Sequence, residues 1–449
     1  MTGKTTVASH LPIIGPACGF IRSNLQLTIL ALCACWLLVA GCRQALRSSI
    51  DFIPVYTGAR CLLKGCNPYD TAQLDTQYYQ SGGLAKDPRR WVRTPPVYPP
   101  SALLVFSPLA LLRFPVASMF FSAISGLSLI ACVVSVRSMV PQSSRWLVTI
   151  LGSCYLFSLS TVVHIVGAGQ SAGVVISLLI LGTLLYLRGR YIPLATILLA
   201  LSLSIKPQLG IMIVLYLVFK RIYWRQAALA IAGSIILLVI GGCILQSRPV
   251  SAHWISDMRA QIIESQKPGL TNDPRPANPG ATGFANLQAV SSVFIADPIT
   301  YNAVGYVIFL AAMALWVAAA IRRGSGQADH WLALAALSAI SLLPIYHRDY
   351  DTRLLIIALP AVAIIFRQRR ILGSVVIAVA LLNIFAASLL RHTLGVLHIL
   401  FDHRITAQLM QQNKLLFVIL LRQESLQMLV LAGCFLAAMF IVRLPAAQE

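Results

Sequence analysis

A carboxylate, Asp51, stands shortly after the first long apolar segment of the chain. That segment, residues 25–42, carries no charge, and Asp51 follows it by nine residues. The side chain is therefore expected near a membrane surface, on whichever side the segment delivers it. A carboxylate in that place can act as a general base toward a hydroxyl group of a substrate held in lipid. The alternative is a residue at a helix N-terminus that only accepts hydrogen bonds from local amides.

A second candidate is Lys206, which separates two short apolar segments at 191–205 and 207–219. A helix over 191–205 is about 22 Å long at ~1.5 Å per residue, shorter than the ~30 Å hydrocarbon core. Lys206 is then expected within the depth of the membrane, where a cation costs about 2.5–3.5 kcal/mol unless it meets water or an anion. It can contact a phosphate in a cavity, or its side chain can extend to the membrane surface.

Two further segments carry candidate binding groups. Residues 347–351, His-Arg-Asp-Tyr-Asp, join two apolar segments, and His347, Arg348 and Asp351 are candidates for substrate binding, with Asp349 as an alternative base. The spacing also suits a divalent metal, but mutual neutralisation in a salt-bridge cluster is the favoured interpretation, and no metal or other cofactor is predicted. Gln170 follows a Gly-Ala-Gly sequence and opens another apolar segment. Helix N-terminal amides there can bind an anion, or the glycines can serve close helix packing.

Composition defines the class of the protein. Of its 449 residues, 58% are hydrophobic and 11% are charged, against about 25% charged in soluble domains. We therefore predict an all-α polytopic membrane protein that forms one domain over residues 1–449. The formal net charge of +21 is dispersed between the apolar segments, which indicates contact with membrane lipids or a phosphate-bearing substrate and argues against nucleic acid as a partner. Cys61 and Cys66 can pair if their loop faces an oxidising compartment.

The lysines and arginines of the short loops predict the topology, because they accumulate on the cytoplasmic side. Both termini are then cytoplasmic, loops 44–99 and 246–300 are extracytoplasmic, and 100–113 is re-entrant or interfacial. Asp51, Gln170, Lys206 and 347–351 share the outer face. About twelve spans are predicted, at 25–43, 115–137, 146–164, 170–187, 191–205, 207–219, 226–245, 301–321, 331–346, 351–366, 371–390 and 424–442.

Several of these residues, in the same order, resemble glycosyltransferase family 87, integral membrane enzymes of the GT-C superfamily. The resemblance covers roughly residues 45–360 and rests on Asp51, Tyr56, Ala59, Gly65, Pro68-Tyr69, Tyr98-Pro99-Pro100, Pro108, Gly169-Gln170, Lys206-Pro207 and the stretch from Ser341 to Pro360. Residue 66 is Cys where family members often carry a polar residue, and the tail beyond 390 has no recognised match, so the acceptor stays open.

The resemblance implies a GT-C-like helix bundle with extracytoplasmic loops. It also implies inverting transfer of a sugar, mannose-like or another hexose or pentose, from a polyprenyl-phosphate donor to a lipid- or glycan-linked acceptor. The site of transfer that the resemblance implies is the extracytoplasmic face of the plasma (inner) membrane. In this scheme Asp51 is the general base and Tyr56 is among the substrate-binding residues.

The main alternative is a lipid or glycolipid transporter or flippase. A broken helix pair with a buried lysine is also typical of transporters. The chain shows no two-fold repeat, and its long loops lie on one side, which argues against that class. A purely structural membrane subunit leaves Asp51 and Lys206 unexplained. No Walker or Rossmann fingerprint indicates a nucleotide.

Overall fold

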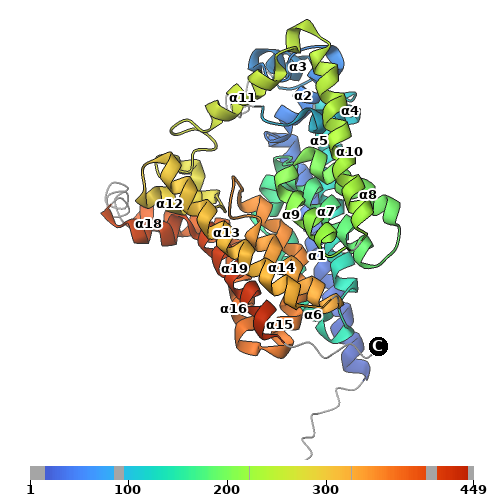
Figure 1. Cartoon of the computed structure of the whole chain (residues 1–449), viewed down its shortest axis with the longest axis vertical. Coiled ribbons are helices and arrows are strands. Elements are labelled where there is room, and N and C mark those ends of the chain that lie inside the picture. Colours follow the sequence, from blue (N-terminus) through green and yellow to red (C-terminus); the bar gives the residue numbers. More distant parts are fainter. Residues whose placement is uncertain (1–15, 85–95, 222, 325, 401–411, 443–449) are drawn as a thin grey trace, which may run out of the picture.

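The computed structural model describes residues 16–84, 96–221, 223–324, 326–400 and 412–442 (Figure 1). Within these ranges the chain forms helices and no strand, apart from an isolated bridge between Phe284 and Arg348. Five of the described helices are long and apolar enough to cross a membrane. The predicted class, an all-α polytopic membrane protein, is confirmed. The five are α1 (Pro16–Ser48), α5 (Phe114–Ser138), α10 (Trp224–Gln246), α13 (Pro298–Arg322) and α19 (Gln423–Ile441).

A sixth crossing exists if a bent pair counts as one span. Helix α6 (Arg145–Phe157) and the π-helix η3 (Ser160–Gly167) meet at an angle of 58°. The other predicted spans correspond to shorter helices or parts of helices, so the count of about twelve stays a prediction. These are α7 (Ala172–Leu187), α8 (Ile192–Ile205), α9 (Pro207–Phe219), α14 (Gln327–Ile340), α15 (Leu359–Gln368) and α16 (Arg370–Leu400).

The short helix pair predicted around Lys206 is present. Helix α8 ends at Ile205 and α9 begins at Pro207, so Lys206 is the residue at the break. Proline suits the first position of a helix, because the amide hydrogen it lacks has no intrahelical partner there. The segment 100–113 contains α4 (Pro100–Ala110), whose 11 residues extend about 16 Å and are too short to cross the bilayer.

The stretch between α14 and α15 differs from the prediction. Spans were expected at 331–346 and 351–366, but α14 ends at Ile340 and a 3-10 helix, η6 (Asp349–Ala358), precedes α15. Pro344 lies in the gap, and proline cannot donate the backbone hydrogen bond that a helix requires. The Asp351 carboxylate then accepts from the Arg348 amide at 3.1 Å and caps the start of η6.

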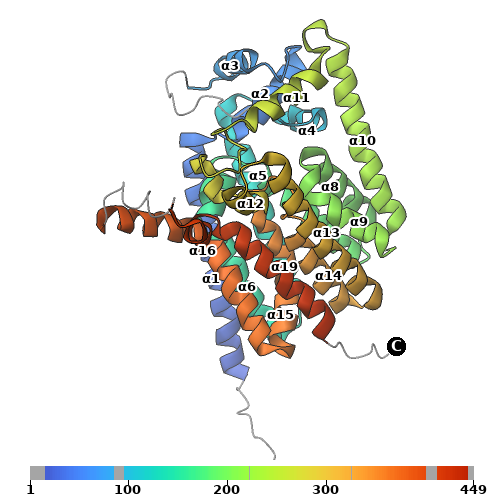
Figure 2. The same cartoon turned by 60° about the vertical axis from the view of Figure 1, so that its left-hand side comes forward.

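The two long loops predicted on one face contact each other. The first carries α2 (Phe52–Lys64) and α3 (Thr71–Gln80), and the second carries α11 (Trp254–Ser265) and α12 (Gln288–Phe294). The Asn67 amide donates to the Asp257 carboxylate at 2.8 Å, and the Gln261 amide donates to the Tyr69 carbonyl at 3.0 Å. Helices α2, α3 and α11 accordingly gather at the same end of the molecule (Figures 1 and 2). Cys61 and Cys66 form a disulfide in the first loop.

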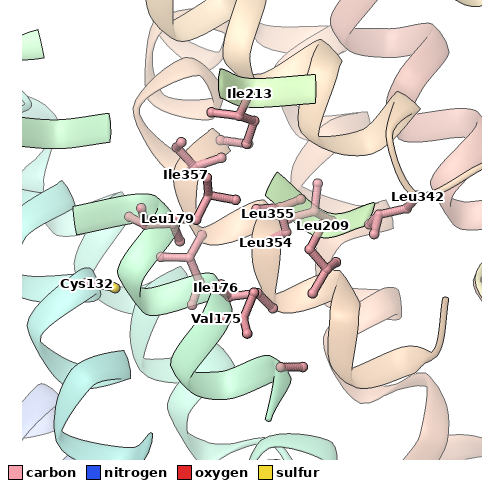
Figure 3. Packing of buried hydrophobic residues seen from close by; sticks show 14 of the residues in the cluster. Cys132, Val175, Ile176, Leu179, Leu209, Ile213, Leu342, Leu354, Leu355 and Ile357 are labelled. Carbon is pink, nitrogen blue, oxygen red and sulfur yellow. The ribbon is translucent and has the colours of Figure 1, made fainter. Parts of the chain in front are cut away.

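A tightly buried apolar core lies behind the break at Lys206. Helix η6 supplies Leu354 and Ile357, which pack with Ile176 of α7 and Ile213 of α9 (Figure 3). These side chains are at most 1% exposed. Their close packing holds α7, α9 and η6 together through van der Waals contacts, the main source of association between helices in a membrane.

The contact between the two loops generates a topology test. Thr76 and Ala277 are exposed, one in each loop, and Gln327 is exposed at the start of α14. In a background that keeps only the Cys61–Cys66 pair, Thr76→Cys and Ala277→Cys should react with an impermeant maleimide in intact spheroplasts. Gln327→Cys, beside the basic pair at 322–323, should react only after permeabilisation. The opposite labelling pattern would show that the predicted topology is inverted.

Candidate functional site

Five helices begin around one cavity of about 320 Å³, a size within the range of small-molecule sites. They are α2, α4, α7, α9 and η6. A helix N-terminus carries a partial positive charge and unpaired amide hydrogens, so a cluster of such ends favours an anion. The cavity is lined by residues at or just before these starts, namely Asp51, Pro99, Gln170, Lys206 and Arg348, with Tyr98, Thr271, Asn272, Tyr346, Tyr350 and Asp351 among the others.

Lys206 faces this cavity with its charge matched by protein groups. Its amine donates to the Gln170 side-chain oxygen at 3.0 Å and lies 3.7 Å from an Asp351 carboxylate oxygen. It also lies 5.3 Å from the centroid of the Tyr350 ring, within range of a cation–π interaction. The predicted cavity with a lysine at the helix break is therefore present, and the Lys206 side chain is directed toward Gln170, Tyr350 and Asp351.

Asp51 is held at the cavity by its backbone. Its amide donates to the Ala168 carbonyl at 2.9 Å, and its carboxylate accepts from Gln170. The side chain does not cap α2, so the alternative of a purely local helix-capping role does not hold. Burial raises the pKa of Asp51 above its ordinary value, while the charges of Arg348 and Lys206 oppose that rise. A carboxyl group of raised pKa is a better proton acceptor near neutral pH.

Arg348 supplies a second cation to the cavity. Its guanidinium donates to the Thr271 carbonyl at 3.0 Å and lies 5.3 Å from the Phe284 ring and 5.7 Å from the Tyr346 ring. Its Nε is buried and has no hydrogen-bond partner among the described residues. Arg348 lines the cavity, and the planar guanidinium group is suited to phosphate oxygens.

Two residues of the segment 347–351, His347 and Asp349, do not line the cavity. His347 is 1% exposed; its Nδ1 lies 3.4 Å from the Asp351 carboxylate. The Asp349 carboxylate accepts from the Ser160 hydroxyl at 2.7 Å and lies 3.1 Å from His164 Nδ1. Burial alone would raise the pKa of Asp349, but His164, Ser160 and Arg353 together lower it to about 2.

These contacts separate the residues that a metal would need. His347 pairs with Asp351, whereas Asp349 pairs with Ser160 and His164. No group of three or more His, Cys, Asp or Glu residues in the described part of the chain is arranged to hold a metal ion. Mutual neutralisation within the segment is limited to His347 and Asp351, because Arg348 donates to the Thr271 carbonyl and Asp349 finds its partners outside the segment.

Tyr56 does not lie where a substrate-binding residue would. Its side chain is 0% exposed, and its hydroxyl donates to the Leu112 carbonyl at 2.7 Å. The ring packs among aromatic side chains that include Phe52 and Phe114. Tyr56 therefore stabilises the aromatic core behind α2, because a fully buried tyrosine needs a partner for its hydroxyl and finds it there.

Three tyrosines that were not among the candidates from the sequence line the cavity instead. They are Tyr98, Tyr346 and Tyr350. The Tyr98 hydroxyl lies 3.1 Å from the Ser171 hydroxyl, beside Gln170. Tyr346 and Tyr350 lie next to or within the polar segment 347–351, and Tyr98 precedes two prolines, so their positions beside other candidates were the available signal. His164 stands at the end of the predicted span 146–164, but its pairing with Asp349, 185 residues further along the chain, had no signal in the sequence.

Gly169 provides a test of how the backbone positions Asp51. Its φ is +72°, and a Cβ there would lie 2.7 Å from the Phe52 Cβ, next to Asp51. Gly169→Ala should cost about 1–2 kcal/mol from the left-handed conformation alone. Displacement of Asp51 should further lower the catalytic rate up to about 10²-fold, as a misplacement of 1 Å can.

Gly269→Ala is the matched control. Gly269 has a φ of +79°, and nothing lies within 4 Å of the position that a Cβ would take there. Thermal unfolding in detergent and turnover of both purified variants give the comparison. Equal loss of activity in the two variants would contradict a specific role for Gly169.

The sequence model of glycosyltransferase family 87 matches residues 97–346, more than half of the chain. The match contains Tyr98, Gln170 and Lys206, whereas Asp51 and Arg348 lie outside it. No curated protein and no solved structure matches the chain. The extent of the family match decides between a transferase and the alternative of a transporter: the chain belongs to glycosyltransferase family 87 and is a membrane glycosyltransferase.

Proposed function

We propose that the protein transfers a sugar from a polyprenyl-phosphate donor to a lipid- or glycan-linked acceptor, with inversion, on the extracytoplasmic face of the plasma membrane. One observation carries the proposal: a carboxylate, Asp51, and two cations, Lys206 and Arg348, line the same cavity. A displacement at a sugar–phosphate bond needs a base for the incoming hydroxyl and positive charge for the leaving phosphate. The cavity supplies both.

The reaction proceeds in one step. Asp51 takes the proton of the acceptor hydroxyl as its oxygen attacks the anomeric carbon. The bond from that carbon to the phosphate oxygen breaks, and the polyprenyl phosphate leaves with the electron pair. Lys206, Arg348 and the surrounding helix N-termini stabilise the charge on the departing phosphate. The proton then passes from Asp51 to solvent.

The partners of the three carboxylates favour Asp51 as the base. Asp351 lies beside Lys206 and His347, and Asp349 beside Ser160 and His164. Asp349, with its pKa of about 2, is a poor proton acceptor at neutral pH. Asp51 accepts a hydrogen bond from the neutral amide of Gln170, and burial raises its pKa.

The arrangement of the loops supports the extracytoplasmic side. The first loop contains the Cys61–Cys66 disulfide, and disulfides persist in oxidising compartments. The second loop packs on the first and contributes Thr271 and Asn272 to the cavity. The basic pair at 322–323 lies at the far end of α13 from that loop, as the distribution of lysine and arginine in short loops requires.

Asp51→Asn should abolish most transfer while the protein still folds. The amide keeps the size of the side chain and removes the base, so we expect the rate to fall about 10²–10⁴-fold. Purified protein incubated with a panel of radiolabelled polyprenyl-phosphate sugars and candidate acceptors gives the measurement. Asp75→Asn, in the same loop but away from the cavity, is the control and should keep full activity. Transfer at the wild-type rate by Asp51→Asn would contradict Asp51 as the base and make Asp349 or Asp351 the next candidate.

Lys206→Met should weaken donor binding and change the pH dependence. Loss of a hydrogen bond from a charged group costs about 1.5–3 kcal/mol, which corresponds to a ~10–100-fold weaker Kd. The wild-type kcat/KM should rise with pH as Asp51 loses its proton. Since the charge of Lys206 lowers the pKa of Asp51, its removal should move that rise to higher pH.

Lys64→Met, an exposed lysine at the end of α2, serves as the control for charge alone. Both quantities are measured on purified protein, with equilibrium binding for the donor and rate profiles for the pH dependence. Unchanged donor affinity in Lys206→Met would remove Lys206 from the donor site.

A further inference from the structure

A second cavity, of about 210 Å³, lies against the first at the C-terminal end of α1. Its lining includes Leu46 in the last turns of α1, Ile50 just after α1, Ile53 of α2, Leu84, and Phe114 of α5. Ile50 lines both cavities and directly precedes Asp51 in the chain. One side chain therefore forms a shared wall between the proposed reaction centre and the second cavity.

The second cavity is apolar and open at an apolar rim. Leu46 is 60% exposed, Ile50 44% and Leu84 61%, at the end of a helix that is long enough to cross a membrane. The hydroxyl groups of Ser49 and Ser118 hydrogen-bond to each other, and Tyr78, the third residue with a hydroxyl group in the lining, is only 3% exposed. The rest of the lining is mostly alanine, leucine, isoleucine, phenylalanine and proline, so the cavity is suited to a hydrocarbon chain.

The geometry of an inverting displacement indicates which of the two substrates a hydrocarbon chain in the second cavity would belong to. The attacking hydroxyl and the leaving phosphate lie on opposite sides of the anomeric carbon. The hydroxyl must lie within hydrogen-bond reach of Asp51, whereas the phosphate lies toward Lys206 and Arg348. A chain that passes Ile50, the neighbour of Asp51, therefore belongs to the molecule that carries the hydroxyl.

We propose that the acceptor is a glycolipid and that a segment of its alkyl chain occupies the second cavity. This inference rests on the proposed function and narrows it, because it selects a lipid-linked acceptor over a free glycan. The sugar of the acceptor enters the first cavity beside Asp51. Its chain leaves past Ile50, between Leu46 and Leu84, toward the bilayer.

Leu46→Trp narrows the rim of the cavity without touching the proposed reaction centre. Val39→Trp is the matched control, because Val39 lies seven residues earlier on α1, hence on the same face, is 69% exposed, and does not line the cavity. The acceptor sugar found in the panel assay is offered as its hexadecyl glycoside and as its methyl glycoside. Both have the same hydroxyl groups, and only the first has a chain to bury.

Leu46→Trp should raise the KM for the hexadecyl glycoside about tenfold over Val39→Trp, with the donor KM unchanged. Transfer to the methyl glycoside, however slow, should be the same in both variants. If Leu46→Trp does not fold, Leu84→Trp, on the same rim, takes its place.

Equal KM values for the hexadecyl glycoside in the two variants would overturn the inference and leave the proposed function intact. A rise in the donor KM instead would assign the cavity to the donor chain and would equally overturn it. Failure of the wild-type protein to transfer sugar from any polyprenyl-phosphate donor would remove the proposed function itself.

Discussion

The charge of Lys206 is the constraint on which the rest of the structure depends. It lies at a break between two short helices with its side chain only 13% exposed, and a buried cation without a partner would cost several kcal/mol. The protein satisfies it with the Gln170 oxygen at 3.0 Å and the Asp351 carboxylate at 3.7 Å. These partners stand near the starts of α7 and η6, so satisfying one charge requires three helix beginnings to converge. The apolar core of α7, α9 and η6 makes that convergence stable.

The convergence of these helix starts also gives the three carboxylates different partners. Asp351 offsets the charge of Lys206, and Asp349 is held by Ser160 and His164. Both are therefore stabilised in the ionised form. Asp51 meets a neutral amide in a buried setting that raises its pKa. The different proton affinities of chemically identical groups thus follow from their partners.

The parts of the chain outside the family match complete the site. The match ends at residue 346, but the Arg348 guanidinium follows it and is held by the Thr271 carbonyl. That loop is in turn fastened by the C-terminal helices, because Arg422 donates to the Ala289 carbonyl at 3.1 Å and Ser425 to the Phe284 carbonyl at 2.9 Å. Removing the partner of such buried groups costs about 1–3 kcal/mol each. The C-terminal helices therefore help to position a cation of the cavity.

Sequence alone determined the membrane class and most helix boundaries. It also singled out Asp51, Gln170, Lys206, Arg348 and Asp351, which line the cavity, because polar groups beside apolar segments are costly and so stand out. It could not separate Tyr56, which is buried in an aromatic core, from Tyr98, which lines the cavity. Nor could it show that Asp349 pairs with His164, or that η6 replaces the start of a span. Only the tertiary structure decided these points, since the partner of a side chain depends on which helices meet in space, and the periodicity of each helix does not specify that.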